Sequence, residues 1–288
     1  MRKKKMIEEK VAILTDSGSD VPAEIAKELG IFVLPLQVNY KARSYRDGVD
    51  IDAETVYEGL ETEVPTTSLP LGSDLTDLLE KIRGEGYTRI LGVLLSSGLS
   101  GTFNMVRLQA MDSPIPMDVL DTKNIGIGSG MSAIKAAQLA KAGVAYDEIV
   151  RLTKHSIENT KIFFVLSTLE YLKRGGRIGK VSAMIGSAFD IKPIITCNEE
   201  GIYTTVAKAR GRKQSLRKVV ELALEYAKDA SSVTLSVAHG NAPQDAQDIK
   251  AEMVSQLHKV SNVFIGPVSP ALGVHTGPGL IGVCVHKD

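Results

Sequence analysis

The sequence predicts an α/β protein of two domains, with a parallel sheet in the N-terminal domain and a mixed α+β arrangement in the C-terminal domain. In the first half, apolar runs typical of buried strands alternate with helical stretches. Strands joined by a hairpin are expected only in the second half. The length of 288 residues suits one large domain or two modest ones. We therefore expect two domains, 1–160 and 161–288.

The first domain opens with a strand, a polar loop and a helix, which together form half of a βαβ unit. The strand Val11–Leu14 runs into the polar loop 15–20, Pro22 starts the helix and Gly30 ends it. Asp52 and Ser73 are the expected N-caps of two later helices. The further elements expected in this half are a strand over 31–38, helices over 52–60 and 73–83, a buried strand over 89–95, a helix ending at Met111, a short strand at 119–120, and helices over 125–142 and 146–159.

The second domain begins with a strand over 161–166. Its clearest element is an amphipathic helix over 213–228, because the apolar residues of this stretch share one face. Glu199–Gly201 is typical of a hairpin turn between strands over 192–197 and 202–209. The other elements expected here are a short helix ending in 173–177, a helix over 181–189, a strand over 233–238, a helix over 243–257, and strands over 263–265 and 280–285.

Composition excludes several classes of protein. Lys plus Arg and Asp plus Glu each number 34, so the formal net charge is zero, which argues against nucleic-acid binding by bulk charge. Cys197 and Cys284 lie far apart and match neither a redox motif nor a zinc spacing, so we expect no metal and a reducing compartment. Charged residues follow the basic start where an export signal would be apolar. The charge-free stretch 260–286 holds three prolines, so it is no spanning helix. We expect a soluble, cytoplasmic protein without stable membrane insertion.

Three loops rich in hydroxyl groups and glycine stand where strands end, namely 15–20, 64–70 and 96–102. Ligands of open α/β sheets bind beyond the carboxyl ends of the strands. The loop 96–102 also leads into a helix N-terminus, which favours an oxyanion. The alternative is that Ser100 merely caps this helix. Loops that cradle nucleotide phosphates, the His-Glu-x-x-His motif and the Gly-x-Ser-x-Gly elbow are absent from the sequence.

A histidine and two basic clusters are further candidates. His275 lies among the small residues of 273–279, which implies close approach of a backbone or a ligand, although a lone loop histidine also serves structural roles. The basic clusters lie at 173–177, continued by Lys180, and at 208–213, and such patches suit phosphate or an acidic partner. A solvated helix face does not explain Arg177 and Arg210, because each sits beside glycine in an expected turn.

Taken in order, these loops resemble the DegV family, bacterial proteins that bind fatty acids. Residues 11–20 resemble its opening strand and D-S-x-x-D turn, and 65–70 resemble its P-x-T-S-Q-P loop, with Leu69 in place of glutamine. Residues 95–104 resemble its L-S-S-x-L-S-G-T-Y-N segment. The resemblance covers residues 11–283 and continues in the expected order at 121–122, 172–177, 209–211 and 275–279.

The resemblance implies a long-chain fatty acid buried between the two domains. It implies that the hydroxyl groups of Thr67 and Ser100 hold the fatty-acid carboxylate, with His275 and Arg177 in the surrounding polar network. Burial of ~15 methylenes contributes about 12 kcal/mol before binding costs, while the carboxylate needs donors. We expect Leu69 to change the packing beside the head group and to leave Thr67 in place.

The resemblance also implies a carrier without catalytic residues, cofactor or metal. A separate fatty acid kinase subunit uses ATP to make the acyl phosphate, which the carrier then holds, and Arg210 lies on the surface that meets this kinase. The alternative is an enzyme acting alone through the Ser100 loop, either a serine esterase or a small-molecule kinase. The esterase has no candidate base except His275, and the kinase has no loop for ATP phosphates.

Overall fold

The N-terminal half is built on a four-stranded sheet in which all neighbouring strands are parallel. The computed structural model describes residues 9–184 and 190–288. The strand order is β2-β1-β6-β7, so the chain leaves β1 toward β2 on one side and resumes at β6 on the other. Loops at the carboxyl ends of β1 and β6 therefore diverge, which opens a crevice for a ligand. The strands are β1 (Val11–Asp16), β2 (Ile31–Leu34), β6 (Arg89–Leu94) and β7 (Met117–Asp121).

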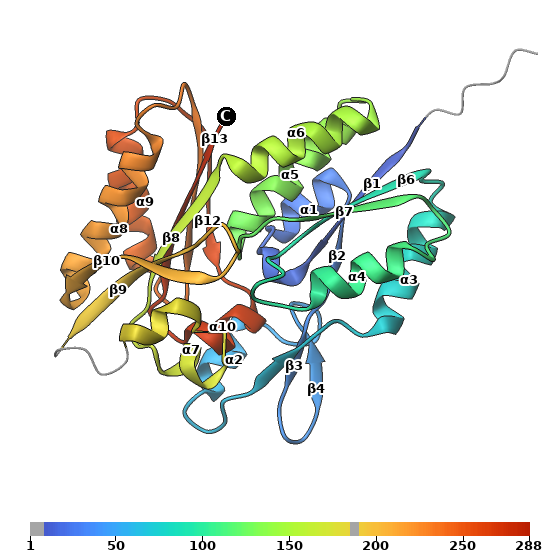
Figure 1. Ribbon diagram of the computed structural model, residues 1–288. Helices are drawn as coiled ribbons and strands as arrows, with labels where there is room; N and C mark the ends of the chain where they lie inside the picture. The colour runs from blue at the N-terminus through green and yellow to red at the C-terminus, as the bar shows by residue number, and fades with distance from the viewer. Residues whose placement is uncertain (1–8, 185–189) are drawn as a thin grey trace, which may run out of the picture.

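The C-terminal half is built on a six-stranded mixed sheet of order β10-β9-β8-β13-β11-β12. All its neighbours are antiparallel except β11 and β12, which run parallel. One face is covered by α8 (Gly211–Ala227) and α9 (Pro243–Gln256), as Figure 1 shows. The strands are β8 (Thr160–Val165), β9 (Ile191–Cys197), β10 (Tyr203–Arg210), β11 (Val233–His239), β12 (Val260–Pro267) and β13 (Ile281–Lys287).

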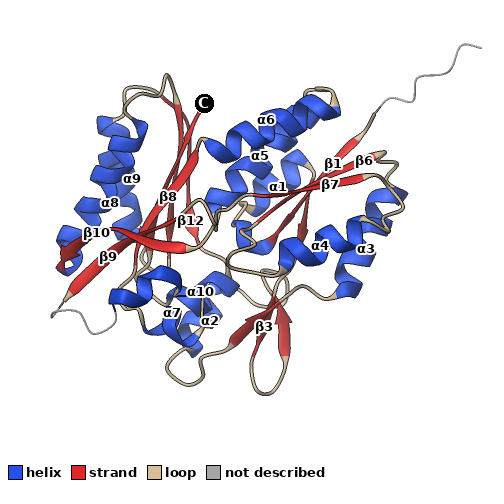
Figure 2. Cartoon of the chain, viewed as in Figure 1, coloured by secondary structure: helices blue, strands red, loops and turns tan. Residues whose placement is uncertain are grey.

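Helices separate the two large sheets (Figure 2). The central one is α5 (Ile127–Lys141), which contacts β1 and β6 on one side and β8 and β13 on the other, and is buried along most of its length. Its small residues allow this close packing, since a Cβ atom on Gly130 would lie 2.3 Å from the backbone oxygen of Ser19. Beside it lie α1 (Ala23–Leu29) and α6 (Tyr146–Glu158), while α3 (Gly72–Gly84) and α4 (Thr102–Ala110) cover the opposite face of the parallel sheet.

A third, small sheet brings distant parts of the chain together below the two large ones in Figure 1. It is antiparallel, with the order β4-β3-β5. Its core contains Leu36, Val38 and Tyr57 together with Val274 from near the end of the chain. The elements in this region are β3 (Gln37–Asn39), β4 (Ser44–Arg46), β5 (Thr66–Ser68), α2 (Ala53–Gly59), α7 (Glu170–Arg174), α10 (Pro270–Thr276) and the short 3₁₀ turns η1 (Ser17–Ser19) and η2 (Gly179–Met184).

The predicted fold class is confirmed by the parallel N-terminal sheet and the mixed C-terminal sheet. The predicted N-cap at Asp52 is also confirmed, because its carboxylate accepts a hydrogen bond from the backbone N–H of Thr55 at 2.8 Å. The amphipathic helix expected over 213–228 corresponds to α8, whose Val219 and Val220 are buried. The domain boundary at 160/161 stays a prediction. Within the described residues, no helix combines the length and apolar character needed to cross a bilayer.

Two predictions about strands in the first half are wrong. The strand expected over 31–38 is split around Pro35 into β2 and β3, because proline lacks the N–H that a ladder needs and here marks a change of sheet. Hairpin pairing is not confined to the second half, since β3 and β4 are antiparallel neighbours. These strands are only three residues long and include polar residues such as Asn39 and Ser44, so no apolar run marks them.

Three helix predictions need correction. Ser73 is not an N-cap, because α3 already begins at Gly72 and its N-cap Leu71 makes no side-chain bond. His275 does not lie in a loop but in α10, a helix that starts at a proline and ends before a glycine. Of the helix expected over 181–189, residues up to 184 form η2, and 185–189 lie outside the described residues. The start of the chain, where we expected no export signal, is likewise outside them through residue 8.

Candidate ligand-binding site

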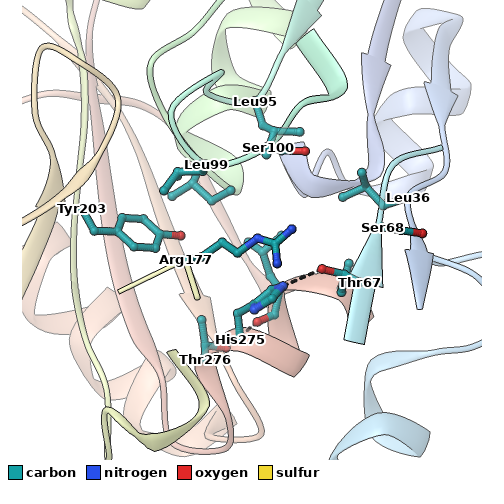
Figure 3. Close-up of a pocket in the computed structure, with 13 residues that line it drawn as sticks. Leu36, Thr67, Ser68, Leu95, Leu99, Ser100, Arg177, Tyr203, His275 and Thr276 are labelled. Atoms are coloured by element: carbon teal, nitrogen blue, oxygen red, sulfur yellow. Dashed lines mark hydrogen bonds between the residues drawn. The ribbon is translucent and has the colours of Figure 1, made fainter. Parts of the chain in front are cut away.

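A pocket lies where the small sheet, the Ser100 loop, the turn after α7 and α10 meet (Figure 3). Polar side chains line one part of the pocket and aliphatic side chains line the rest. The lining residues are Leu36, Thr67, Ser68, Leu95, Leu99, Ser100, Ile125, Arg177, Tyr203, Ala271, Leu272, His275 and Thr276.

The Thr67 hydroxyl and the His275 imidazole form a short hydrogen bond across the pocket, with 2.6 Å between Oγ1 and Nε2. Thr67 lies in β5, which pairs with β3 through Val38, and His275 lies in the last turn of α10. Burial, and after it the nearby positive charge of Arg177, lowers the pKa of His275 to about 4. The imidazole is therefore neutral at pH 7, so it brings no positive charge of its own to the site.

Gly175 explains how the turn after α7 comes so close to His275. A Cβ atom at position 175 would lie 1.9 Å from His275 Nδ1, so only glycine leaves room for the ring. The guanidinium of Arg177 donates a hydrogen bond from Nη1 to the backbone oxygen of Gly175 at 2.9 Å. In Figure 3 its side chain extends into the pocket, with the guanidinium between Ser100 and the Thr67–His275 pair.

Ser100 stands just before α4, in the loop that follows β6. Its Oγ accepts a hydrogen bond from the backbone N–H of Thr102 at 3.3 Å and shares another with the Thr102 hydroxyl at 2.9 Å. Gly101, rather than Ser100, holds the N-cap position, and it makes no side-chain cap bond. Ser100 thus supports the first turn of the helix and also lines the pocket. The Asp16 carboxylate holds the start of this loop, because it accepts a hydrogen bond from the backbone N–H of Leu95 at 2.9 Å.

A second, smaller cavity adjoins the first. The two share Ile125, Tyr203, Leu272 and Thr276 in their walls. Most of the second wall is aliphatic or aromatic, and the Tyr203 ring packs edge-on against Phe164 with 5.2 Å between ring centroids. Burial raises the pKa of the Tyr203 hydroxyl well above its usual value, so this group stays neutral. The two cavities together offer a polar end and an apolar extension.

All four residues predicted for the head group and its polar network line the first pocket, namely Thr67, Ser100, His275 and Arg177. Three polar residues of the wall were missed. Ser68 directly follows Thr67, and Thr276 directly follows His275, so both could have been found as neighbours of predicted site residues. Tyr203 carried none, because one tyrosine at the start of a strand looks like an ordinary core residue.

Arg210 lies away from this pocket, at the end of β10 and directly before α8. β10 is an edge strand of the six-stranded sheet, since it pairs only with β9. Lys208 and Arg210 are exposed and alternate along it, whereas Arg212 is paired with Asp245 at 2.7 Å. Among the described residues, the Arg210 side chain makes no hydrogen bond or ion pair.

Comparison with known proteins gives a consistent family. The sequence model of the DegV family, described as "Uncharacterised protein, DegV family", matches residues 10–288. A DegV domain-containing protein of Clostridium acetobutylicum is 41% identical over 280 residues, which is 97% of this chain and 99% of the relative.

Solved structures agree with this match. A structure described as fatty acid binding of a DegV family protein from Thermus thermophilus aligns with a TM-score of 0.91 at 26% identity, over 97% of this chain and all of that one. A stearic acid-binding protein from Eubacterium ventriosum aligns with a TM-score of 0.84 at 26% identity, over 97% and 98% of the two chains.

Proposed function

This chain belongs to the DegV family, and we propose that it binds a long-chain fatty acid between its two domains, presents the carboxylate to a separate ATP-dependent fatty acid kinase, and then holds the acyl phosphate. Solved relatives are described as binding fatty acids. The observation that carries the proposal is the pair of joined cavities, one with a polar cluster and one almost wholly apolar. A fatty acid, which is an apolar chain with one oxyanion at its end, fits this pair of cavities.

The head group is assigned to the polar cluster. The carboxylate accepts hydrogen bonds from the hydroxyl groups of Thr67 and Ser100, and the positive charge of Arg177 offsets its desolvation. These three side chains line one pocket and come from three different parts of the chain, which supports the assignment of one oxyanion to all of them. None of them has to act as a nucleophile.

His275 is assigned the task of orienting the Thr67 hydroxyl. Among the described residues, His275 Nδ1 is buried without a partner. The tautomer with its hydrogen on Nε2 leaves only an acceptor unsatisfied, which costs less than a buried unpaired N–H. That hydrogen then donates to Thr67 Oγ1, so the Thr67 hydroxyl proton is free to donate to the ligand carboxylate. A neutral imidazole suffices for this role.

The acyl chain is assigned to the second cavity, between the central helix and the six-stranded sheet. Its walls are formed by side chains such as Ile127, Ile162 and Leu280. Burial of alkyl groups there supplies most of the affinity, while the polar cluster sets the direction in which the chain lies. The carboxylate then lies at the end of the site formed by loops, where a partner enzyme gains access.

The kinase is proposed to dock on the exposed cationic end of β10, around Arg210 and Lys208. Cations on an edge strand also discourage pairing with strands of other chains. This surface therefore suits a soluble partner that binds reversibly through charge. We place the exchange in the cytoplasm, where a kinase has access to ATP.

Stand-alone esterase chemistry has less support from the geometry. Within the described residues, the hydrogen bonds of the Ser100 hydroxyl go to Thr102, whereas His275 Nε2 bonds to Thr67. A serine nucleophile needs a base within reach of its own hydroxyl, and this histidine is engaged elsewhere. The contact between His275 and Thr67 therefore favours a role in ligand binding over a role in catalysis.

The test begins with the purified protein. Mass spectrometry of extracted lipid and calorimetric titration with palmitate and oleate should show one bound fatty acid per chain. Incubation with ATP and a fatty acid kinase should then yield acyl phosphate only when both proteins are present. Absence of binding to either acid, or steady turnover of nitrophenyl esters by the protein alone, would contradict the proposal.

A further inference from the structure

Three aspartates lie behind the pocket, and the function proposed above gives their carboxyl groups no role. They are Asp16 at the end of β1, Asp20 after η1, and Asp47 after β4. Asp16 and Asp47 are buried, whereas Asp20 is partly exposed, has a buried Oδ2 atom and also lines the apolar cavity. Asp16 and Asp20 belong to the polar loop that follows the first strand, and Asp47 carried no signal in the sequence. We propose that Asp16, Asp20 and Asp47 act as one positioning unit, which holds the loop of Ser100 and the helix of His275 in register for a single carboxylate. This inference rests on the proposed fatty-acid binding.

The first contact of this unit reaches the Ser100 side of the pocket. Asp16 Oδ2 accepts a hydrogen bond from the backbone N–H of Leu95 at 2.9 Å, directly before the loop that carries Ser100. The next residue, Ser96, donates its hydroxyl to the backbone oxygen of Gly201 at 2.8 Å, which ties the same loop to the turn before β10. The position of Ser100 therefore depends on Asp16 at one end of the loop.

The other contacts of this unit reach the His275 side. Asp20 Oδ1 accepts from the backbone N–H of Ser269 at 2.9 Å, and Asp47 Oδ1 accepts from that of Ala271 at 3.0 Å. Both N–H groups belong to the start of α10, whose last turn carries His275 and Thr276. Two carboxyl groups from the first half of the chain thus seat a helix from its last twenty residues.

Asp47 is tied to Ser17, which lies in the loop between Asp16 and Asp20. Asp47 Oδ2 accepts from the Ser17 hydroxyl at 2.6 Å, and Ser17 Oγ in turn accepts from the backbone N–H of Leu36 at 2.9 Å. Within the described residues, Asp16 Oδ1 and Asp20 Oδ2 are buried without a hydrogen-bond partner. No group of three acidic, histidine or cysteine side chains there has the geometry of a metal site. The unit is thus held together by backbone donors and one hydroxyl.

No cation in the described part of the chain forms an ion pair with these carboxyl groups. The titratable groups facing them are the hydroxyls of Tyr57 and Tyr203, and burial raises the pKa of both above the usual value, so they stay neutral. Asp52 lines the same groove but is exposed and caps α2. The negative charges of the unit therefore act mainly on one another.

Burial raises the pKa of Asp16 to about 7, of Asp20 to about 8 and of Asp47 to about 6, and the negative charge of Asp47 adds to the rise at Asp16 and Asp20. Near neutral pH the unit therefore retains protons, and each further ionisation adds repulsion at the seat of α10. All three side chains line a groove between the two halves of the chain, through which protons exchange with solvent. Rising pH should loosen the helix and so weaken fatty-acid binding.

The test is the pH profile of palmitate affinity, measured by displacement of a fluorescent fatty acid between pH 6.5 and 9. The dissociation constant of the wild-type protein should rise about 10-fold, an ordinary size for coupling between two sites. Asp20→Asn keeps an acceptor for Ser269 and tolerates the left-handed backbone at this position, where φ is 49°. Because Asp20 also lines the apolar cavity, the readout is the change with pH and not the affinity itself. The dissociation constant of the variant should change less than about 3-fold between pH 6.5 and 9.

Two controls separate the causes. Asp229→Asn removes an exposed carboxylate outside the unit and should keep the wild-type profile. If Asp20→Asn does not fold, Asp16→Asn takes its place with the same expected flattening, because the pKa of Asp16, about 7, also lies within this pH range. A flat wild-type profile, or an unchanged slope in the folded Asn variants, would overturn the inference. Loss of palmitate binding by the wild type at every pH would instead overturn the proposed function.

Discussion

The Thr67–His275 pair shows how one residue in the pocket prepares another. His275 is neutral because it is buried beside Arg177, and its Nε2 lies 2.6 Å from the Thr67 hydroxyl. A charged imidazole there would neutralise the ligand carboxylate directly. A neutral imidazole leaves Arg177 to neutralise the carboxylate and itself directs the hydroxyl proton of Thr67. This makes the site selective for a group that accepts hydrogen bonds.

The hydroxyl groups themselves give the first prediction. Thr67→Ala and Ser100→Ala should each weaken palmitate binding by about 1–3 kcal/mol, because each leaves a buried charged acceptor without one of its donors. The double variant should depart from the sum of the two, since both hydroxyls contact one carboxylate. Calorimetric titration measures all three. Wild-type affinity in both single variants would place the carboxylate elsewhere.

At the residue scale, the sequence was informative wherever a side chain carries recognisable chemistry. Ser100 stood out because its loop is rich in hydroxyl groups and glycine and follows a predicted strand. Arg177 and His275 stood out because each has glycine neighbours, and Thr67 was identified through the family resemblance. Asp47 did not, because its neighbours are ordinary polar residues, and only the folded chain brings it against α10. Contacts over such separations follow from the topology and not from local pattern.

At the element scale, long periodic segments were predictable and short ones were not. The apolar run before residue 95 is long enough to indicate a buried strand, and the amphipathic stretch of α8 has enough residues to reveal its helical period. Three-residue strands such as β5 carry no period at all. In α10, Gly273 lowers the local helix propensity. The helix forms because Ala271 and Val274 pack against α2 and because the aspartates accept hydrogen bonds from its first N–H groups.

The close approach of two elements gives the second prediction. Gly175→Ala should weaken fatty-acid binding, because the new methyl group would lie 1.9 Å from His275 Nδ1 and must push the imidazole away from Thr67. The backbone conformation at 175 is helical, so an alanine there is not strained by its own φ. Titration with palmitate should show at least about a 5-fold loss, the effect of displacing one hydrogen-bonded group.

Gly84→Ala is the matched control for this change. A Cβ atom at the last residue of α3 meets no neighbour within 4 Å, so it should leave binding intact and raise helix stability slightly. Equal affinities of the Gly175→Ala protein and the wild type would mean that the ring position is irrelevant to the ligand.

At the scale of the whole molecule, the pH dependence of folding gives the third prediction. The pKa values of the three aspartates are raised in the folded state, so their contribution to stability is fully present below about pH 4 and is lost as pH rises to about 8. His275, with its pKa lowered to about 4, acts in the opposite sense and loses stability as pH falls below 6.5.

Above pH 6.5 His275 no longer changes the stability with pH, so only the effect of the aspartates remains. The free energy of unfolding should therefore fall between pH 6.5 and 8, by up to about 1.4 kcal/mol per pH unit for each retained proton. Urea titrations at several pH values measure it. Asp20→Asn should reduce this slope, and a wild-type stability that rises across the same window would show that the aspartates are already ionised.

The last prediction concerns the surface far from the pocket. Arg210 is exposed at the end of the edge strand β10, and it is not paired with an acidic side chain among the described residues, whereas Arg212 is held by Asp245. An arginine in this position is available to an acidic partner, and its removal leaves the core untouched. Arg210→Glu should therefore slow acyl-phosphate formation by the kinase, with fatty-acid affinity and melting temperature nearly unchanged.

Ionic strength and a matched variant refine this test. The ratio of wild-type to Arg210→Glu rates should shrink as salt rises, because screening over about 10 Å at 0.1 M already weakens long-range attraction in the wild type. Arg83→Glu reverses an exposed arginine on α3, close to the end of that helix and on the other half of the molecule, and should leave the kinase rate at the wild-type level. An Arg210→Glu protein that loses fatty acid or unfolds would show that this arginine ties the turn before α8 to its neighbours, and kinase docking would then have to lie on another face.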